Sequence, residues 1–255
     1  MEFKSHNDFD NFQRHVRFER RYVQTEPVME FLAALATTLP GRTRSLSQGV
    51  VLYRAQIGYD EDDIEGAVTI TGFSERRMKP NREFCGEGRA NPRGIAYLYL
   101  SNHLDTSMAE MRPQRGQMLS VAQFEVQRNL NLVDCYSVEQ EFGNIELIFS
   151  PPSTQEGIRN AIWWQINQAF SRPISRGDSS SDYIPTQILA EFFRHHGFDG
   201  VCFKSGLGEG HNFVLFDLAA AELINCGVYD VKAVKYEFGE CANRYYKKKT
   251  NRDNS

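Results

Sequence analysis

The sequence GFDGVCFKSGLGEGHNFVLF, residues 197–216, carries the clearest structural pattern in the chain. Two short apolar runs, 200–204 and 212–216, flank a glycine-rich segment, which predicts two strands joined by a turn. A helix is predicted just before them, over residues 185–196, because Gly197 is a good left-handed C-terminal cap. The stretch therefore predicts a helix that leads into two sequential strands.

Outside this stretch, short apolar runs predict more strands than helices. Strands are predicted over residues 49–54, 95–101, 118–126, 130–135 and 228–238, and helices over 9–23, 26–38 and 105–112. Residues 137–172 are predicted to be mainly helical, and residues 58–93 to form a long polar loop. Strands that do not alternate regularly with helices are typical of an α+β domain rather than of a doubly wound sheet.

These patterns divide the 255 residues into three expected parts. Residues 1–48 are expected to form a helical N-terminal extension, and residues 49–240 a core domain. Within that domain, residues 136–182 form a mainly helical enlargement. The basic and polar tail, residues 241–255, is expected to be disordered.

Composition excludes several classes of protein. The formal net charge of -4 argues against a broad nucleic-acid-binding surface, which needs a dense excess of Lys and Arg. The N-terminus lacks the basic-then-apolar pattern of a secretory signal, and no apolar run approaches the roughly 20 residues of a membrane span. Five widely spaced cysteines without a Cys-x-x-Cys pair indicate neither a disulfide framework nor a zinc site. We therefore expect a cytoplasmic protein without a metal and without direct contact to membranes or nucleic acid.

Three polar residues at the edges of predicted elements suggest chemistry. Arg54 ends a predicted strand, Arg89 lies in a glycine-rich loop, and Glu110 lies on the predicted helix 105–112. Guanidinium groups bind pyrophosphate through paired hydrogen bonds, and a carboxylate can stabilise the positive charge that develops on a sugar when its C1 bond breaks. The three residues together suit a phosphorylated glycoside, although each alone is more often a surface ion pair or part of a solvated helix face.

Two tyrosines and one turn add further candidates. Tyr97 and Tyr99 project to the same side of their predicted strand, where a ring could stack on a nicotinamide or adenine base or pack in the core. The turn after Ser205 has the wrong glycine spacing for a dinucleotide fingerprint, but its amides and hydroxyl could hold a phosphate, or it could be a plain hairpin. Lys204-Ser205-Gly206 is not the elbow of a serine hydrolase.

Taken together, these segments resemble the RES domain, a family named for Arg, Glu and Ser residues. The matching segments are Leu52-Tyr53-Arg54, Gly88-Arg89-Ala90-Asn91-Pro92 with Gly94 and Tyr99-Leu100, Ala109-Glu110-Met111-Arg112, Gly197-Phe198-Asp199-Gly200-Val201 with Ser205, and Gly210-His211-Asn212-Phe213-Val214-Leu215-Phe216. The five blocks occur in the expected order between about residues 50 and 220. One departure is Ala90, where the family often has a bulky aromatic residue.

The resemblance implies a fold similar to the ADP-ribosyltransferases, with a mixed, mostly antiparallel sheet and flanking helices. It also implies that NAD is the substrate rather than a bound cofactor, and that a helical antitoxin is the protein partner. The catalytic residues of the family map onto Arg54, Glu110 and Ser205, with Arg89, Tyr97, Tyr99 and Asn212 as substrate-binding residues.

The expected function is therefore cleavage of the nicotinamide-ribose bond of NAD, by a glycohydrolase or a phosphorylase that is the toxin of a toxin-antitoxin pair. An ADP-ribosyltransferase that modifies a protein is one alternative. A catalytically idle module that binds a dinucleotide or a partner is an alternative of another class.

Overall fold

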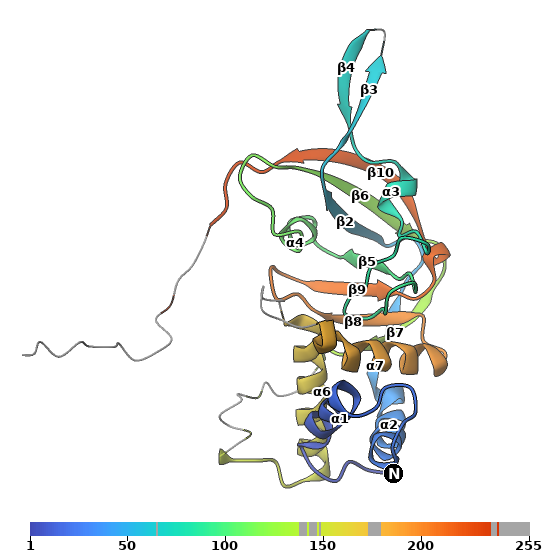
Figure 1. Ribbon diagram of the computed structural model, residues 1–255, viewed down its shortest axis with the longest axis vertical. Helices are drawn as coiled ribbons and strands as arrows, with labels where there is room; N and C mark the ends of the chain where they lie inside the picture. The colour runs from blue at the N-terminus through green and yellow to red at the C-terminus, as the bar shows by residue number, and fades with distance from the viewer. Residues whose placement is uncertain are drawn as a thin grey trace, which may run out of the picture.

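The computed structural model describes residues 1–64, 66–137, 142, 147, 149–172, 180–235 and 239. An eight-stranded sheet organises these residues, with the strand order β1-β7-β8-β9-β5-β2-β6-β10 (Figure 1). Its strands are β1 (Thr43–Leu46), β2 (Val51–Ile57), β5 (Leu98–Ser101), β6 (Met118–Val126), β7 (Leu130–Asp134), β8 (Gly200–Lys204), β9 (His211–Leu215) and β10 (Ala221–Asp230). Every neighbouring pair is antiparallel except β7 and β8. The prediction of an α+β fold with a mostly antiparallel sheet is confirmed.

The longer helices gather at one end of this sheet. The helices are α1 (Asp8–Phe18), α2 (Glu26–Thr38), α3 (Glu75–Met78), α4 (Leu104–Ala109), α6 (Gln155–Ser171) and α7 (Ile184–His195), and Figure 1 shows α1, α2, α6 and α7 grouped next to β7 and β8. Two parallel strands need a long crossover between them. Helices α6 and α7 occupy that crossover. None of the helices in the described residues is long and apolar enough to cross a lipid bilayer.

Alternation along the strands gives the sheet a hydrophobic core on each face. In β8, Val201 and Phe203 pack in the core shared with the four long helices, whereas Cys202 belongs to the core on the other face. In β9, Val214 faces the helices and Leu215 faces away from them. Burying each large apolar side chain stabilises the fold by roughly 1.5–3 kcal/mol. Alternate side chains of β8 and β9 therefore belong to the two different cores.

A two-stranded hairpin projects from the opposite end of the molecule (Figure 1). It consists of β3 (Asp60–Ile64) and β4 (Ala67–Thr71), paired from Asp60 opposite Thr71 to Ile64 opposite Ala67. The expectation of a continuous loop over residues 58–93 is wrong for this segment. Acidic residues are depleted in strands, so the acidic run of β3 was not recognised as a strand. Its partner β4 is rich in β-branched residues, which favour strands.

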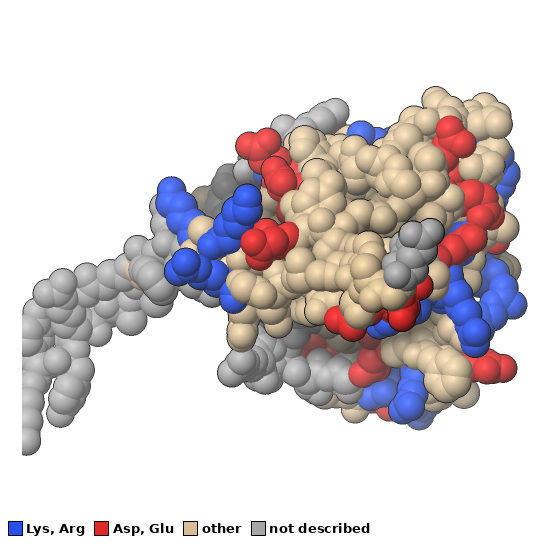
Figure 2. All heavy atoms as spheres, turned by 90° about the horizontal axis from the view of Figure 1, so that it is seen from above, with Lys and Arg blue, Asp and Glu red and all other residues tan. Residues whose placement is uncertain are grey.

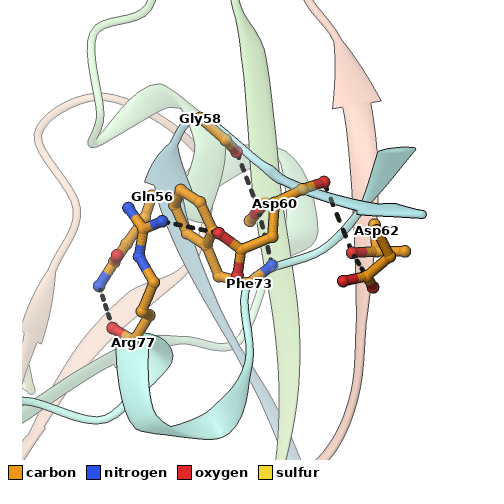
Figure 3. Close-up of polar contacts among 8 residues, drawn as sticks. Gln56, Gly58, Asp60, Asp62, Phe73 and Arg77 are labelled. Carbon is orange, nitrogen blue, oxygen red and sulfur yellow. Dashed lines mark hydrogen bonds and ion pairs between the residues drawn. The ribbon is translucent and has the colours of Figure 1, made fainter. Parts of the chain in front are cut away.

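The base of the hairpin is tied to the main sheet by a compact polar cluster (Figure 3). Arg77 donates a hydrogen bond to Asp60 at 2.8 Å, and its guanidinium lies 3.5 Å from the centre of the Phe73 ring. Gln56 of β2 donates to the carbonyl of Arg77 at 3.0 Å. The buried Ser120 hydroxyl donates to the Gly58 carbonyl and accepts from the Phe73 amide. The hairpin therefore leaves the sheet at a fixed point.

Several other predicted elements have the expected bounds. Helix α2 and strand β6 span the residues that were predicted, while α1 ends at Phe18 instead of Val23. The last strand, β10, covers residues 221–230 rather than 228–238, of which 236–238 lie outside the described residues. The predicted tail lies outside them too, as do parts of the region 137–172.

Strand β1 lies within the segment that was expected to be a helical extension. It pairs with β7 from Thr43 opposite Val133 to Leu46 opposite Leu130, and so forms one edge of the main sheet. The first 48 residues are therefore not helical throughout. On the face seen in Figure 2, the described Lys and Arg side chains are interspersed with Asp and Glu around a mainly uncharged centre.

Replacement of Gly200 by alanine tests the closeness of β8 and β9. A Cβ atom at this position would lie 2.2 Å from the carbonyl oxygen of Val214, so one strand must shift. We expect Gly200→Ala to lower the free energy of unfolding by about 3 kcal/mol or more. Gly41→Ala is the matched control, because nothing lies within 4 Å of the added atom. Denaturant unfolding measures both, and equal stability of the two variants would contradict the packing described.

Candidate active site

A cleft of about 640 Å³ opens beside β2, β5 and α4. Side chains from all three elements, from β8 and β9, from the loop before β5 and from the residue just before α7 converge on it. The lining residues are Tyr53, Arg54, Ala55, Gln56, Arg89, Tyr99, Leu100, Ser101, Ser107, Glu110, Met111, Arg112, Tyr183, Phe203, Leu207 and Asn212. The size suits a small-molecule ligand, because such pockets commonly measure 300–1,000 Å³. Arg54, Arg89 and Glu110, which are far apart in the sequence, all line this one cleft.

Arg54 brings a poorly solvated positive charge to the wall of the cleft. Its Nη1 donates a hydrogen bond to the Tyr99 carbonyl at 3.1 Å, while its buried Nε has no hydrogen-bond partner. Burial lowers the pKa of Arg54 to about 10, so the group remains a cation at neutral pH. A buried donor without a partner costs free energy unless a ligand satisfies it. Arg54 therefore places at the wall of the cleft a cation that would attract an anionic oxygen.

Arg89 is held by the enlargement that joins β7 to β8. Its guanidinium donates to the carbonyl of Phe170, in the last turn of α6. Burial lowers the pKa of Arg89, and the negative charge of Glu110 opposes that shift. The carboxylate of Glu110 therefore favours the charged form of Arg89.

The loop around Arg89 is fixed by side chains on both sides. From α7, Thr186 donates to the Arg89 carbonyl at 2.6 Å, and Gln187 donates to the carbonyls of Gly88 and Asn91. A Cβ atom on Gly88 would lie 2.6 Å from the Tyr99 hydroxyl, so only glycine allows this close approach. The arginine is thus presented by a preorganised loop.

Asn91 is the centre of that loop. It is only 2% exposed, and its amide donates to the carbonyls of Gly86 and Ile95 at 2.9 and 2.8 Å. Its Oδ1 accepts a hydrogen bond from the Tyr99 hydroxyl at 2.7 Å. Burial raises the pKa of Tyr99, which keeps this hydroxyl protonated and able to donate. Tyr99 therefore joins the loop to β5.

Glu110 follows the last residue of α4 and receives two hydrogen bonds on one oxygen. The Ser205 hydroxyl donates to Oε1 at 2.8 Å, and the Asn212 amide donates to the same atom at 2.6 Å. Ser205 lies just after β8, and Asn212 lies within β9. The carboxylate is thus oriented by two neutral donors, one in β9 and one directly after β8.

The structure separates the two candidate tyrosines. Tyr99 lines the cleft, whereas Tyr97 lies among the apolar side chains of the helical core, where its ring is 4.8 Å from that of Phe216. Burial raises the pKa of Tyr97. Both rings lie on the helical side of the sheet, as the alternation predicted, but Tyr97 does not line the cleft.

Sequence reasoning missed several residues that build this site. Asn91 lay inside a matched block without an assigned role. Thr186 and Gln187 belonged to a helix that was given no role in the site, and Tyr183 lies just before that helix. The signal available in the sequence was the pair of polar residues in the first turn of that helix. In the described part of the chain, no three His, Cys, Asp or Glu side chains converge to form a metal site.

The chemistry available in the cleft follows from these contacts. Two guanidinium groups can bind anionic oxygens, and a fixed carboxylate can stabilise a positive charge next to them. A ligand that carries both phosphate groups and a centre that becomes cationic would use the whole arrangement.

Comparison with known proteins identifies the family. The family model for the RES domain matches residues 68–238, more than half of the chain, so the chain belongs to the RES-domain family. Among solved structures, a chain of the M. tuberculosis MbcT-MbcA toxin-antitoxin complex is similar, with 14% sequence identity and a TM-score of 0.41. That similarity covers 78% of this chain and 97% of the other. No curated protein sequence matches the chain.

The free energy of unfolding tests whether the buried charge of Arg54 destabilises the fold. Because Arg54 buries a charge with an unpartnered Nε, we expect Arg54→Met to leave the free energy of unfolding unchanged or to raise it by about 1 kcal/mol. Thermal and denaturant unfolding measure the difference. The exposed Arg115→Met is the control and should stay within about 0.5 kcal/mol of the wild type. A loss of more than about 1 kcal/mol in Arg54→Met would instead make Arg54 a structural residue.

Proposed function

We propose that this chain cleaves the bond between nicotinamide and ribose in NAD. The observation that carries the proposal is the convergence, in one cleft, of the partly unsatisfied guanidinium of Arg54 with the oriented carboxylate of Glu110. NAD combines a pyrophosphate with a glycosidic bond whose cleavage leaves positive charge on the sugar. Its two chemical features therefore match the two kinds of group in the site.

In this proposal the arginines hold the pyrophosphate. Arg54 has a donor without a partner, and Arg89 sits on a loop fixed by α7. Paired hydrogen bonds between guanidinium groups and phosphate oxygens give both affinity and orientation. The ring face of Tyr99 offers a surface for the sugar or a base, since the ring borders the cleft while its hydroxyl donates a hydrogen bond to Asn91.

Glu110 then acts on the ribose. As the bond from C1′ to the nicotinamide nitrogen breaks, its electron pair leaves with nicotinamide, which becomes neutral, and the ribose takes on oxocarbenium character. The carboxylate stabilises this charge. Water adds to C1′ and releases a proton, which gives ADP-ribose, whereas phosphate or a protein side chain would give the phosphorylase or transferase reaction instead.

The biological role proposed here is that of a cytoplasmic toxin restrained by a helical antitoxin. Support comes from membership of the RES-domain family and from a site suited to a metabolite that every cell requires. Loss of NAD would stop growth, and a partner protein that covers the cleft would prevent it.

Product analysis tests the reaction. Wild-type protein is incubated with NAD, with and without phosphate, and the products are identified by mass spectrometry. We expect release of nicotinamide, and the second product identifies the acceptor. Intact NAD under all conditions, together with harmless expression of wild type in growing cells, would contradict the proposal and favour an idle binding module.

Replacement of Glu110 tests the role of its carboxylate. Glu110→Gln keeps the shape of the side chain but removes its charge, so we expect kcat to fall by about 10²–10⁴-fold while the affinity for NAD changes little. Steady-state kinetics and calorimetric binding measure the two effects. Glu125→Gln, at an exposed position of β6, is the matched control and should retain activity. An equal activity of Glu110→Gln and wild type would remove Glu110 from the mechanism.

A further inference from the structure

We propose that Asn212 and Ser205 are positioning residues, which fix Glu110 through Oε1 so that Oε2 is the oxygen that acts on the ribose. This inference rests on the proposed cleavage of NAD. It also changes the expected roles of both residues, since Ser205 was expected to be a catalytic residue that helps to hold phosphate, and Asn212 to bind substrate directly.

The first support is the distribution of hydrogen bonds on the carboxylate. Oε1 accepts from both Ser205 and Asn212, at 2.8 and 2.6 Å, whereas no described residue donates to Oε2. Two accepted bonds account for the lone pairs of one carboxylate oxygen. Oε1 is therefore committed to the protein, and Oε2 retains its full capacity for a ligand.

The second support is that the single proton of the Ser205 hydroxyl is already donated within the protein. Its oxygen accepts from the Leu207 amide at 3.1 Å, and its single proton goes to Glu110. Ser205 is also only 6% exposed. A serine with its one proton already donated cannot donate to a phosphate oxygen as well. Its hydroxyl thus acts on the substrate through Glu110.

The third support is that the two donors are themselves rigidly placed. Asn212 lies in β9 opposite Ser101 of β5 on one side and Phe203 of β8 on the other. The turn from Ser205 to Gly210 is tied to α4, because Thr106 donates to the Glu209 carbonyl at 2.5 Å. Donors and acceptor therefore move as one unit.

The physical consequence is preorganisation. A free glutamate side chain carries up to about 2 kcal/mol of rotamer entropy, which must be lost before its charge can face a reaction centre. Hydrogen bonds to an ionised group are among the stronger ones in proteins. Asn212 and Ser205 remove this freedom before the substrate arrives, so their loss should lower the rate of the chemical step more than the affinity.

Three variants and one control test the inference. We expect Asn212→Ala and Ser205→Ala each to lower kcat for NAD by about 10-fold or more while the affinity for NAD stays within about threefold. The double variant should lose less than the product of the two single effects, because both donors serve one atom. The control is Asn225→Ala, which removes an exposed amide of β10 that donates to Gln123 of β6, and it should behave as wild type.

Asn212→Asp supplies a readout that general destabilisation would not produce. A second carboxylate next to Oε1 disfavours the ionised form of its neighbour, so the acidic limb of the pH profile of kcat should move to higher pH. The ¹³C resonance of the Glu110 carboxyl carbon should move with it, at a higher pH than in the wild type. The matching Asn225→Asp should change neither measurement.

The outcomes separate this inference from the proposed function. Active wild type whose Asn212→Ala variant loses affinity but keeps kcat would overturn the positioning role and return Asn212 to substrate binding. An unchanged carboxyl titration in Asn212→Asp would overturn it as well. Wild type that leaves NAD intact would refute the proposed function, and the ¹³C titration alone would then decide whether Asn212 controls Glu110.

Discussion

The antiparallel pairing of β9 with β8 on one side and with β5 on the other underlies the whole site. Its register sets Asn212 opposite both Ser101 and Phe203, and all three residues line the cleft. The chain leaves β5 into α4, which ends next to Glu110, and leaves β8 into the turn that begins with Ser205. Because side chains alternate along a strand, a slip of one residue would turn the Asn212 amide to the other face of the sheet.

The enlargement between β7 and β8 supports one side of the cleft and is not merely an addition to the surface. The parallel pairing of these strands requires a crossover, and α6 and α7 supply it. The same helices contact the loop of Arg89 through the Phe170 carbonyl and through Gln187. The crossover that the parallel pairing requires thus also supports the Arg89 loop, and its residue Tyr183 lines the cleft.

Much of this arrangement could be predicted from periodicity and caps. Strands β6, β7 and β8 and helices α2 and α7 follow strong apolar patterns and have bounds within about a residue of those expected. The candidate residues Arg54, Arg89 and Glu110 were found through their expected positions at element edges, and the cleft contains all of them. The edge position was wrong for Arg54, which lies in the middle of β2 because this strand continues to Ile57. The hairpin was missed because carboxylates have low strand propensity and its pairing depends on the opposite strand. The bond between Asn212 and Glu110 could not be predicted, since it depends on a register between residues about a hundred positions apart.

The projecting hairpin of β3 and β4 has a practical consequence for handling the protein. Its anchoring contacts, between Arg77, Asp60 and Phe73, lie at the base, while most residues of its two strands are exposed. Exposed loop tips held by such local contacts tolerate inserted sequence well. A fluorescent reporter or affinity peptide placed between the two strands would thus be carried away from the cleft, leaving both chain ends unaltered for genetic fusion to other proteins.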